Sequence, residues 1–404
     1  MKNLCKSILA LMFVLTFSQC MPPENNSGTS PSDTVVLFEP PVITDTIPLP
    51  PVYVEPLPQI EIPAPVTPPV VEQPKPEPVV EVKPPAPVKP APELTLRSSP
   101  ITWGVAFKES DLGKQKVIDE TYKHFRSVTA ENGMKAGKVQ KKEGVFDFKD
   151  GKALVKIAKA KGLRVHAHAC FIWPSQESGL PAFWHEAAKD KARYVALLKN
   201  TVQTYVKAFK GDITGIDIIN EAYENNGKLR PCYALTHIGE NYPEQMAKWV
   251  KEIDPSLNVF ISDYDFETKS HKATVVIKYA GELKKKGLVD GISSQMHTGL
   301  GLNYKDYKSR LDEMAKQNLL VHISELDLRK VLPEDEQKKA KVFQDVAKGF
   351  RTLPAPLQYG ITVWSHTNGG NFYNYQLKPQ KWAPVIFDNN FSGGVTLPAI
   401  LEVK

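Results

Sequence analysis

Short apolar segments alternate with amphipathic segments along the chain from residue 101 onward. Eight of the apolar segments are rich in β-branched residues and are bounded by Gly, Asp or Asn, which is typical of buried strands. They cover residues 101–107, 127–131, 163–170, 215–220, 258–264, 289–296, 319–325 and 360–364. The segments between them carry apolar residues at helical spacing, as in residues 151–161, where Leu154 and Ala158 share a face and Gly162 follows as a stop signal.

Eight strand–helix units in succession predict an α/β fold, the (β/α)8 TIM barrel, in which parallel strands close into a cylinder surrounded by helices. A doubly wound open sheet is the structural alternative. Such a sheet normally has a glycine-rich turn for a nucleotide after its first strand, and no such turn follows residues 101–107. We therefore expect a barrel domain over residues 98–404.

The first hundred residues differ in composition from the rest, because they hold 23 of the 34 prolines and a single glycine. Residues 1–20 read as a signal peptide, since Lys2 and Lys6 precede an apolar run too short to span a bilayer. Cys20 follows this run, at the position where a bacterial lipoprotein is lipidated; ordinary cleavage and secretion is the alternative. Proline prevents helix and sheet in residues 21–97, which predict an extended or disordered proline-rich linker.

These features predict an exported protein, held at the bacterial outer membrane or cell surface by a lipid on Cys20, or otherwise periplasmic or secreted. The formal net charge of +6 is mild, and the lysines are scattered among acidic residues, which argues against a nucleic-acid partner. Four cysteines are too few for disulfide bonds to be the main stabilising element of a fold of 404 residues. Cys170 and Cys232 either form a disulfide or remain two buried free thiols, and their spacing leaves both open.

Polar residues gather at the carboxyl ends of the predicted strands, where barrel enzymes place their sites. They are Glu131 and Asn132, His168, Asn220 and Glu221, Tyr264, Gln295 and His297, Glu325, and Trp364. The fourth and seventh strands of such a barrel face each other, so Glu221 and Glu325 can approach to the roughly 5–5.5 Å typical of a retaining glycosidase. One carboxylate would attack the anomeric carbon, and the other would protonate the leaving oxygen.

Five segments resemble, in the same order, the motifs of glycoside hydrolase family 10, the barrel xylanases. They are Val128-Thr-Ala-Glu-Asn-Gly-Met-Lys135, Asn220-Glu221, Ser262-Asp-Tyr264, Gln295-Met-His297 and Ser324-Glu-Leu-Asp327. The resemblance covers essentially all of residues 100–404. It implies a retaining endo-β-1,4-xylanase that hydrolyses xylan or xylo-oligosaccharides through a covalent glycosyl-enzyme intermediate. We expect a monomer that uses no cofactor and no metal ion.

The resemblance also implies a role for each motif residue. Glu325 would be the nucleophile and Glu221 the general acid and then base, while Asn220 would hold the sugar 2-hydroxyl. His297 would hydrogen-bond Glu325, with Asp327 behind it. The other residues implied to contact sugar are Glu131, Asn132, Lys135, His168, Trp173, Gln176, Tyr264, Gln295 and Trp364. The flat rings of Trp173 and Trp364 would wall the site and leave little room for the C6 group of glucose.

The chain departs from the family pattern at three places, which predicts an altered glycone pocket. Ala136 follows Lys135 where an aromatic residue is common in the family. Residues 167–176 carry one extra residue before Trp173, and Pro174 replaces a histidine. The family's second tryptophan after strand eight has no clear match, and Tyr373 or Phe372 could substitute for it.

Three other interpretations compete with a xylanase. The same retaining mechanism could act on a different β-linked glycan. The chain could also be a non-catalytic surface glycan-binding protein, against which the retention of Glu221 and Glu325 argues. His166 and His168 form a His-x-His pair, but the further metal ligands of metal-dependent barrels are missing, so His166 is interpreted as a buried core histidine.

Overall fold

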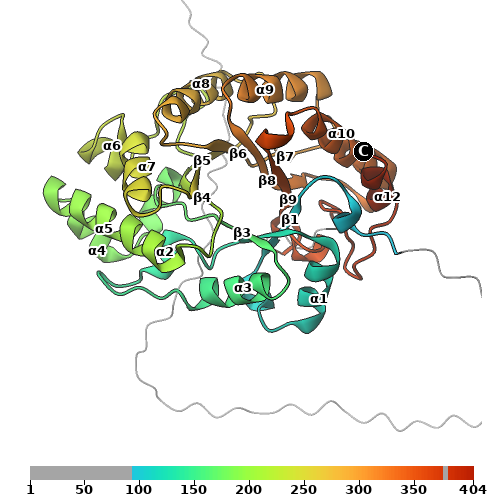
Figure 1. Ribbon diagram of the computed structural model, residues 1–404, viewed down its shortest axis with the longest axis horizontal. Helices are drawn as coiled ribbons and strands as arrows, with labels where there is room; N and C mark the ends of the chain where they lie inside the picture. Colours follow the sequence, from blue (N-terminus) through green and yellow to red (C-terminus); the bar gives the residue numbers. More distant parts are fainter. Residues whose placement is uncertain (1–92, 376–380) are drawn as a thin grey trace, which may run out of the picture. The chain divides into compact units, whose positions relative to one another are not determined.

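The computed structural model describes residues 93–375 and 381–404. The predicted signal peptide, Cys20, and the predicted linker as far as residue 92 lie outside the described residues. Within the described part, the chain forms a barrel of parallel strands surrounded by helices (Figure 1). This confirms the predicted (β/α)8 fold.

Eight strands close the barrel in the order β1-β2-β3-β4-β5-β6-β8-β9, and β9 pairs again with β1. Their bounds are Trp103–Phe107 (β1), Ser127–Ala130 (β2), Arg164–Ala167 (β3), Gly215–Asn220 (β4), Asn258–Asp263 (β5), Gly291–Ser294 (β6), Leu320–Leu328 (β8) and Gln358–Val363 (β9). The two-residue strand β7 (His297–Thr298) pairs with Asp327 and Leu328 at the carboxyl end of β8. This extra pairing brings His297 beside the end of β8.

The helices form a ring around the strands in Figure 1. They are α1 (Gln115–His124), α2 (Ala136–Val139), α3 (Lys149–Lys159), α4 (Ala182–Ala187), α5 (Lys191–Phe209), α6 (Tyr233–His237), α7 (Tyr242–Ile253), α8 (His271–Lys285), α9 (Tyr304–Lys316), α10 (Glu336–Arg351), α11 (Phe372–Tyr375) and α12 (Thr396–Leu401). Short 3-10 turns occur at Leu96–Ser98, Glu109–Asp111, Pro174–Gly179, Pro333–Asp335, Ala355–Leu357 and Asn368–Gly370.

Local sequence signals explain where the long helices begin and end. The side chains of Asp190 and Ser270 accept hydrogen bonds from the backbone N–H groups of Arg193 and Ala273, and so cap α5 and α8. Gly162 follows α3 with a φ of 63°, a left-handed conformation that glycine adopts without steric cost. The strands are almost entirely buried, as expected where helices cover one face and packed side chains fill the other.

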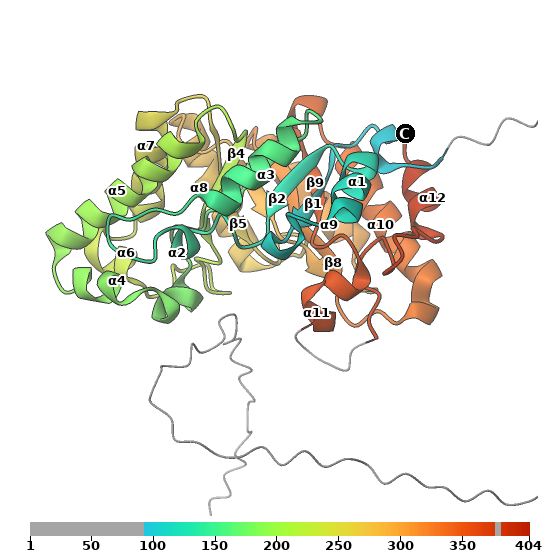
Figure 2. The same ribbon diagram turned by 90° about the horizontal axis from the view of Figure 1, so that it is seen from below.

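The loops at the carboxyl ends of the strands are longer than those at the other end, and they contain additional short helices. The helices α2, α4, α6 and α11 follow β2, β3, β4 and β9 before the main barrel helices begin. Figure 2 shows all four on the same side of the barrel. The candidate polar residues lie at this side, because they end the strands from which these loops start.

A fully buried ion pair joins β5 to α8. Lys272 Nζ lies 2.8 Å from Asp263 Oδ1, and neither side chain is exposed. Burial raises the pKa of Asp263 to about 6 even though Lys272 acts in the opposite direction. Removal of one partner from a buried pair leaves a charge without compensation, which is costly.

Lys272→Met is therefore expected to lower the free energy of unfolding by about 3–5 kcal/mol, as measured by urea denaturation. The pKa of Asp263 would rise further without the lysine, so the loss should be larger at pH 8 than at pH 5. Lys272→Met combined with Asp263→Asn should recover part of the stability, because no charge is then buried. Equal stability of the single variant and the parent at both pH values would contradict this account.

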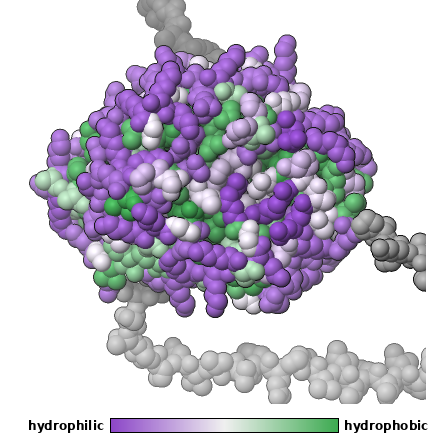
Figure 3. Space-filling view, in the orientation of Figure 1, coloured by the Kyte–Doolittle hydropathy of each residue, from purple (hydrophilic) through white to green (hydrophobic). Residues whose placement is uncertain are grey.

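The surface of the domain is mainly hydrophilic on the face shown in Figure 3, with apolar residues in small scattered groups. Among the described residues, no helix has the length and apolar character needed to cross a membrane. Cys170 and Cys232 are both buried and both free thiols, which decides between the two alternatives that their spacing left open.

Candidate active site

The predicted site residues lie where the strands end. Asn220 is the last residue of β4, Tyr264 and Gln295 follow β5 and β6, and Trp364 follows β9. Glu325 lies within β8, which continues to Leu328. The carboxyl ends of all barrel strands open on the same face, so these side chains converge there.

Three non-glycine residues next to these strand ends adopt left-handed backbone conformations. Cys170 has a φ of 47°, Glu221 a φ of 50° and Met296 a φ of 61°. Such conformations cost energy and tend to cluster at functional sites. At Glu221 the backbone turns out of β4, while its N–H still donates to the carbonyl of Ser262 at 3.0 Å. The turn aims the Glu221 side chain at the same face as its neighbours.

Glu221 accepts hydrogen bonds at both carboxylate oxygens. The indole N–H of Trp173 donates to Oε2 at 3.1 Å, and the amide of Gln295 donates to Oε1 at 3.1 Å. The same amide also donates to Asn220 Oδ1 at 3.0 Å, so both of its hydrogens are used. With its Oδ1 occupied, Asn220 presents its own amide N–H groups as donors, which fits the expected contact with a sugar hydroxyl.

Glu325 lies between two histidines, each of which is backed by an aspartate. Its Oε2 is 3.3 Å from Nε2 of His297, and its Oε1 is 3.6 Å from Nε2 of His168. On the far sides of the two rings, Nδ1 of His297 lies 2.8 Å from Asp327, and Nδ1 of His168 lies 2.8 Å from Asp217. The result is an alternating row of carboxylates and imidazoles, which we call the Asp217–Asp327 row.

The charges along this row keep Glu325 ionised. Burial lowers the pKa of His297, but Asp327 and then Glu325 raise it more strongly, to about 10. Burial likewise opposes the charge on His168, yet the Cys170 sulfur and the carboxylates of Glu325 and Asp217 hold its pKa well above the ordinary value.

Glu325 itself is buried, which alone would raise its pKa. The charges of His168 and His297, with a smaller contribution from Lys135, outweigh this effect and place the pKa of Glu325 below its usual range. A carboxylate that remains charged inside a packed barrel is suited to nucleophilic attack.

Asn371 supports the far end of the row, and the sequence did not identify it. Its amide donates to Asp327 Oδ2 at 3.0 Å and to the carbonyl of Trp364 at 3.1 Å. Its Oδ1 accepts from the backbone N–H of Tyr373. Burial and the nearby Asp327 raise the pKa of Tyr373, whose hydroxyl bonds to Arg329. Tyr373, one of the two proposed substitutes for the missing tryptophan, therefore lies beside the row.

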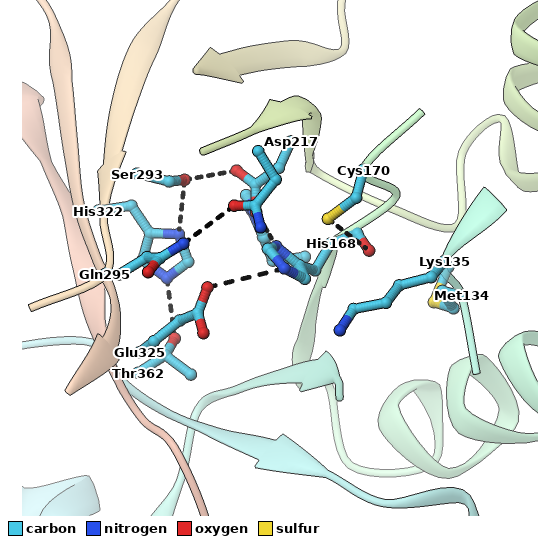
Figure 4. Close-up of polar contacts among 12 residues, drawn as sticks. Met134, Lys135, His168, Cys170, Asp217, Ser293, Gln295, His322, Glu325 and Thr362 are labelled. Atoms are coloured by element: carbon cyan, nitrogen blue, oxygen red, sulfur yellow. Dashed lines mark hydrogen bonds and ion pairs between the residues drawn. The ribbon is translucent and has the colours of Figure 1, made fainter. Parts of the chain in front are cut away.

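Asp217 at the near end was also missed as a site residue. Its Oδ2 lies 2.8 Å from His168 and 3.0 Å from Nε2 of His166, while Ser293 donates to its Oδ1 at 2.5 Å (Figure 4). Burial would raise the pKa of Asp217, but His166 and His168 lower it far below the ordinary value. His166 is thus a fully buried core histidine, as predicted. Its ion-pair partner is Asp217, which also pairs with His168.

A second group of predicted residues surrounds Glu131. Lys135 donates to Asn132 Oδ1 at 3.0 Å, and its ammonium lies 4.6 Å from the centroid of the Trp173 ring. Glu131 is buried, which raises its pKa, although nearby lysines act against this shift. The hydroxyl of Tyr375 donates to Glu131 at 3.5 Å. This group includes Lys135, which lies near enough to Glu325 to lower its pKa. The group is the expected binding region for non-reducing-side sugars.

Tyr264 marks another part of the site, where Arg230 donates to its hydroxyl at 2.8 Å and Lys272 lies 3.3 Å from its ring centroid. Trp364 is largely buried, and its ring meets that of His168 edge-on at 5.7 Å. Gln176 lies in the 3-10 turn that Pro174 begins, with its side chain half-buried and in no hydrogen bond to the predicted residues that the structure describes.

One backbone contact links the two key glutamates. The amide N–H of Glu325 donates at 3.0 Å to the carbonyl of Gln295, whose side chain bonds to Glu221. The site thus presents an ionised, buried carboxylate and a second carboxylate that are joined through Gln295. This combination is what acid-assisted nucleophilic displacement at a sugar requires.

Comparison with known proteins agrees with this chemistry. Residues 93–403 match the model of glycosyl hydrolase family 10. The chain is 27% identical over 300 residues to endo-1,4-beta-xylanase A of Thermoanaerobacterium saccharolyticum, covering 70% of this chain but only 25% of that longer protein.

Two solved structures have the same barrel. Native xylanase 10B from Thermotoga maritima is similar with a TM-score of 0.69 and 27% identity, over 76% of this chain and 96% of that one. Xylanase 10B from Thermotoga petrophila RKU-1, solved in complex with xylobiose, has a TM-score of 0.70 and 25% identity, over 78% and 98% of the two chains. Since the family model covers most of the chain, and the strand ends carry the expected residues, the chain belongs to glycosyl hydrolase family 10.

Proposed function

We propose that the chain is a retaining endo-β-1,4-xylanase that acts as a monomer on xylan or xylo-oligosaccharides. Membership of the family supports this proposal, as do relatives named xylanases. The observation that carries it is the Asp217–Asp327 row, which holds the Glu325 carboxylate between two histidines, with Glu221 linked to Glu325 through Gln295.

In the first step, Glu325 attacks the anomeric carbon, and Glu221 gives its proton to the glycosidic oxygen as that bond breaks. The products are a shortened glycan and a glycosyl ester of Glu325. Once Glu221 has lost its proton, the N–H groups of Trp173 and Gln295 stabilise the resulting carboxylate. Asn220 donates to the 2-hydroxyl of the sugar that bears the reacting carbon.

In the second step, Glu221 takes a proton from a water molecule, which attacks the same carbon and releases Glu325. Configuration at the anomeric carbon is inverted twice and is therefore retained. The rings of Trp173 and Trp364 border the sugar site, and their bulk favours a pyranose without a C6 hydroxymethyl group.

Hydrolysis rates on a panel of glycans test the proposal. We expect the highest kcat/KM on xylan and xylohexaose, and much lower values on barley β-glucan and cellohexaose. Nuclear magnetic resonance should detect the β-anomer of the reducing sugar as the first product. A preference for β-glucan, or an initial α-anomer, would refute the proposal.

The pH profile should depend on His297. At the pH where Glu325 titrates, His297 carries a positive charge that stabilises the carboxylate, because the pKa of His297 is about 10. In His297→Asn this charge is lost, so the pKa of Glu325 rises and the acid limb of kcat/KM moves up by about one pH unit. The control His237→Asn replaces a histidine that bonds to the carbonyl of Ala188, away from the row. An acid limb that stays in place in His297→Asn would contradict this role.

We also propose that the chain is exported and carries a lipid on Cys20, which would hold the barrel at a bacterial membrane through the proline-rich linker. Expression in a Gram-negative host with an alkyne-labelled fatty acid tests this proposal. The parent should be labelled and should fractionate with membranes, whereas Cys20→Ala should be unlabelled. Equal labelling of the two chains would exclude this anchor.

A further inference from the structure

We propose that Ser293 is a positioning residue for the nucleophile, because it fixes the Asp217 carboxylate in the orientation that keeps His168 charged beside Glu325. The inference rests on the proposed function for the role of Glu325. It concerns a buried layer beneath the row, formed by Ser293 on β6, His322 on β8 and Thr362 on β9. This layer touches Asp217 and lies away from the substrate face.

Three contacts connect the layer in sequence (Figure 4). Ser293 Oγ lies 2.5 Å from Asp217 Oδ1 and 3.5 Å from His322 Nδ1, and His322 Nε2 lies 2.8 Å from Thr362 Oγ1. All of these side chains are buried. The chain of contacts crosses the barrel interior from β4 through β6 and β8 to β9.

The direction of each hydrogen bond follows from the charge of Asp217. An ionised carboxylate can only accept, so the Ser293 hydroxyl donates to it. The serine oxygen then accepts from the N–H at Nδ1 of His322, and Nε2 of that ring accepts from the Thr362 hydroxyl. This arrangement requires a neutral His322, and burial together with His166 holds the pKa of His322 well below its ordinary value.

The two carboxylate oxygens of Asp217 have different partners. Ser293 occupies Oδ1, while Oδ2 faces both His166 and His168. Rotation of the carboxylate would therefore decide whether His168 keeps its partner. Without the serine hydroxyl, Oδ1 has no donor and the N–H of His322 has no acceptor. We expect the carboxylate to turn toward His322 and to draw Oδ2 away from His168.

The titratable and charged groups around Asp217 and His168 come from every element packed against these two residues. They are His166 on β3, Cys170 after β3, Tyr205 on α5, His322 and Glu325 on β8, Tyr359 on β9, Arg164 beside Tyr359, and Lys135 beside Cys170. Of these, only His166 lies in ion-pair contact with the Asp217 carboxylate; like His168, it contacts Oδ2. Ser293 is the donor to the other oxygen, Oδ1.

The expected change lies on the alkaline side of the pH range. Below pH 5, His168 is protonated whether or not Asp217 faces it, so the titration of Glu325 changes little. When Ser293 is removed and Asp217 turns away, His168 loses one of the groups that raise its pKa, so the ring loses its proton at a lower pH than in the parent. Glu325 then faces a lone pair at Nε2 of His168 in place of a cation.

Histidine titration by nuclear magnetic resonance measures this effect directly in the full chain, whether or not the chain is active. The signal of His168 is assigned by its loss in His168→Gln. In Ser293→Ala, its titration midpoint should fall by about one unit or more relative to the parent. Thr362→Val, which removes the far end of the layer with little change in volume, should shift it in the same direction by less.

Ser294→Ala is the matched control, since Ser294 is also buried on β6 but its side chain lies on the other side of the strand. It should leave the His168 midpoint unchanged. If Ser293→Ala lowers the melting temperature but not the His168 midpoint, Ser293 is merely structural and the proposal is overturned. An equal shift in Ser294→Ala would overturn it as well, because the effect would then be general loosening.

A kinetic measurement links the titration to catalysis. On an aryl xyloside with an activated leaving group, which needs no proton from Glu221, the alkaline limb of kcat/KM should move to lower pH in Ser293→Ala, by less in Thr362→Val, and not at all in Ser294→Ala. An unchanged alkaline limb would refute the link to Glu325. A parent inactive on every glycoside would instead count against the proposed function, while the histidine titration would still decide the role of Ser293.

Discussion

Glu325→Gln is expected to lower kcat on xylan by about 10⁴–10⁶-fold, the range seen when other enzymes lose a nucleophile. The amide has nearly the shape of the carboxylate but cannot form the glycosyl ester. The buried position of Glu325 makes this substitution informative, because no other described carboxylate is flanked by His168 and His297. Initial rates on xylohexaose provide the measurement.

Substrate binding should survive the same substitution. Isothermal titration with xylohexaose should give a Kd within about tenfold of the parent, since the residues around Glu131 and Trp173 are unchanged. Glu336→Gln is a suitable control, because Glu336 is half-buried at the start of α10, where it accepts from Thr396 and pairs with Lys339, outside the row. Activity in Glu325→Gln close to that of the parent would remove Glu325 from the mechanism.

The effect of Glu221→Ala on kcat/KM should depend on the leaving group of the substrate. For xylan and other poor leaving groups, loss of the general acid should lower kcat/KM by about 10²–10⁴-fold. An activated aryl xyloside should retain most of its kcat/KM, because its leaving group departs without a proton. The glycosyl ester would then persist, since no base remains to activate water.

Azide should accelerate the slow second step in Glu221→Ala. A small anion can occupy the space of the removed side chain and attack without base assistance, which forms a β-xylosyl azide. Chromatography of the products tests this outcome, with Glu325→Gln as the control that azide should not rescue. A uniform loss on all substrates without azide product would count against Glu221 as acid and base.

The alternation of apolar and amphipathic segments was sufficient to predict the barrel, because parallel strands covered by helices have a distinct pattern. The ends of some strands differed from the prediction. The segment 163–170 contains a shorter strand, Arg164–Ala167, because the chain leaves the sheet at His168 and adopts a left-handed conformation at Cys170. Apolar composition continues past that point, so hydrophobicity alone could not show where pairing stops.

The site residues that the sequence indicated are those at strand ends, where a motif and a position coincide. Asp217 was missed because it lies inside a strand of apolar residues, where a single acidic residue gives no indication of its partners. Its sequence signal was the charge itself, since a carboxylate in a buried strand must be paired. Asn371 was missed for a different reason, because it follows β9 in a loop where asparagine is common in turns.

Ser293, His322 and Thr362 could not have been grouped from the sequence. They come from three strands, and their contacts depend on which face of each strand points into the barrel and on the register between strands. A one-residue shift in register would reverse the direction of each side chain.

The alternating row around Glu325 also affects how the reaction ends. While the sugar is esterified to Glu325, that oxygen carries no full charge, and two neighbouring cations face a neutral group. In the proposed mechanism, hydrolysis restores the anion between them, so the histidines that would prepare Glu325 as the nucleophile would also make it a good leaving group. The ester is therefore expected to be short-lived on natural substrates, and its formation, rather than its breakdown, should limit turnover.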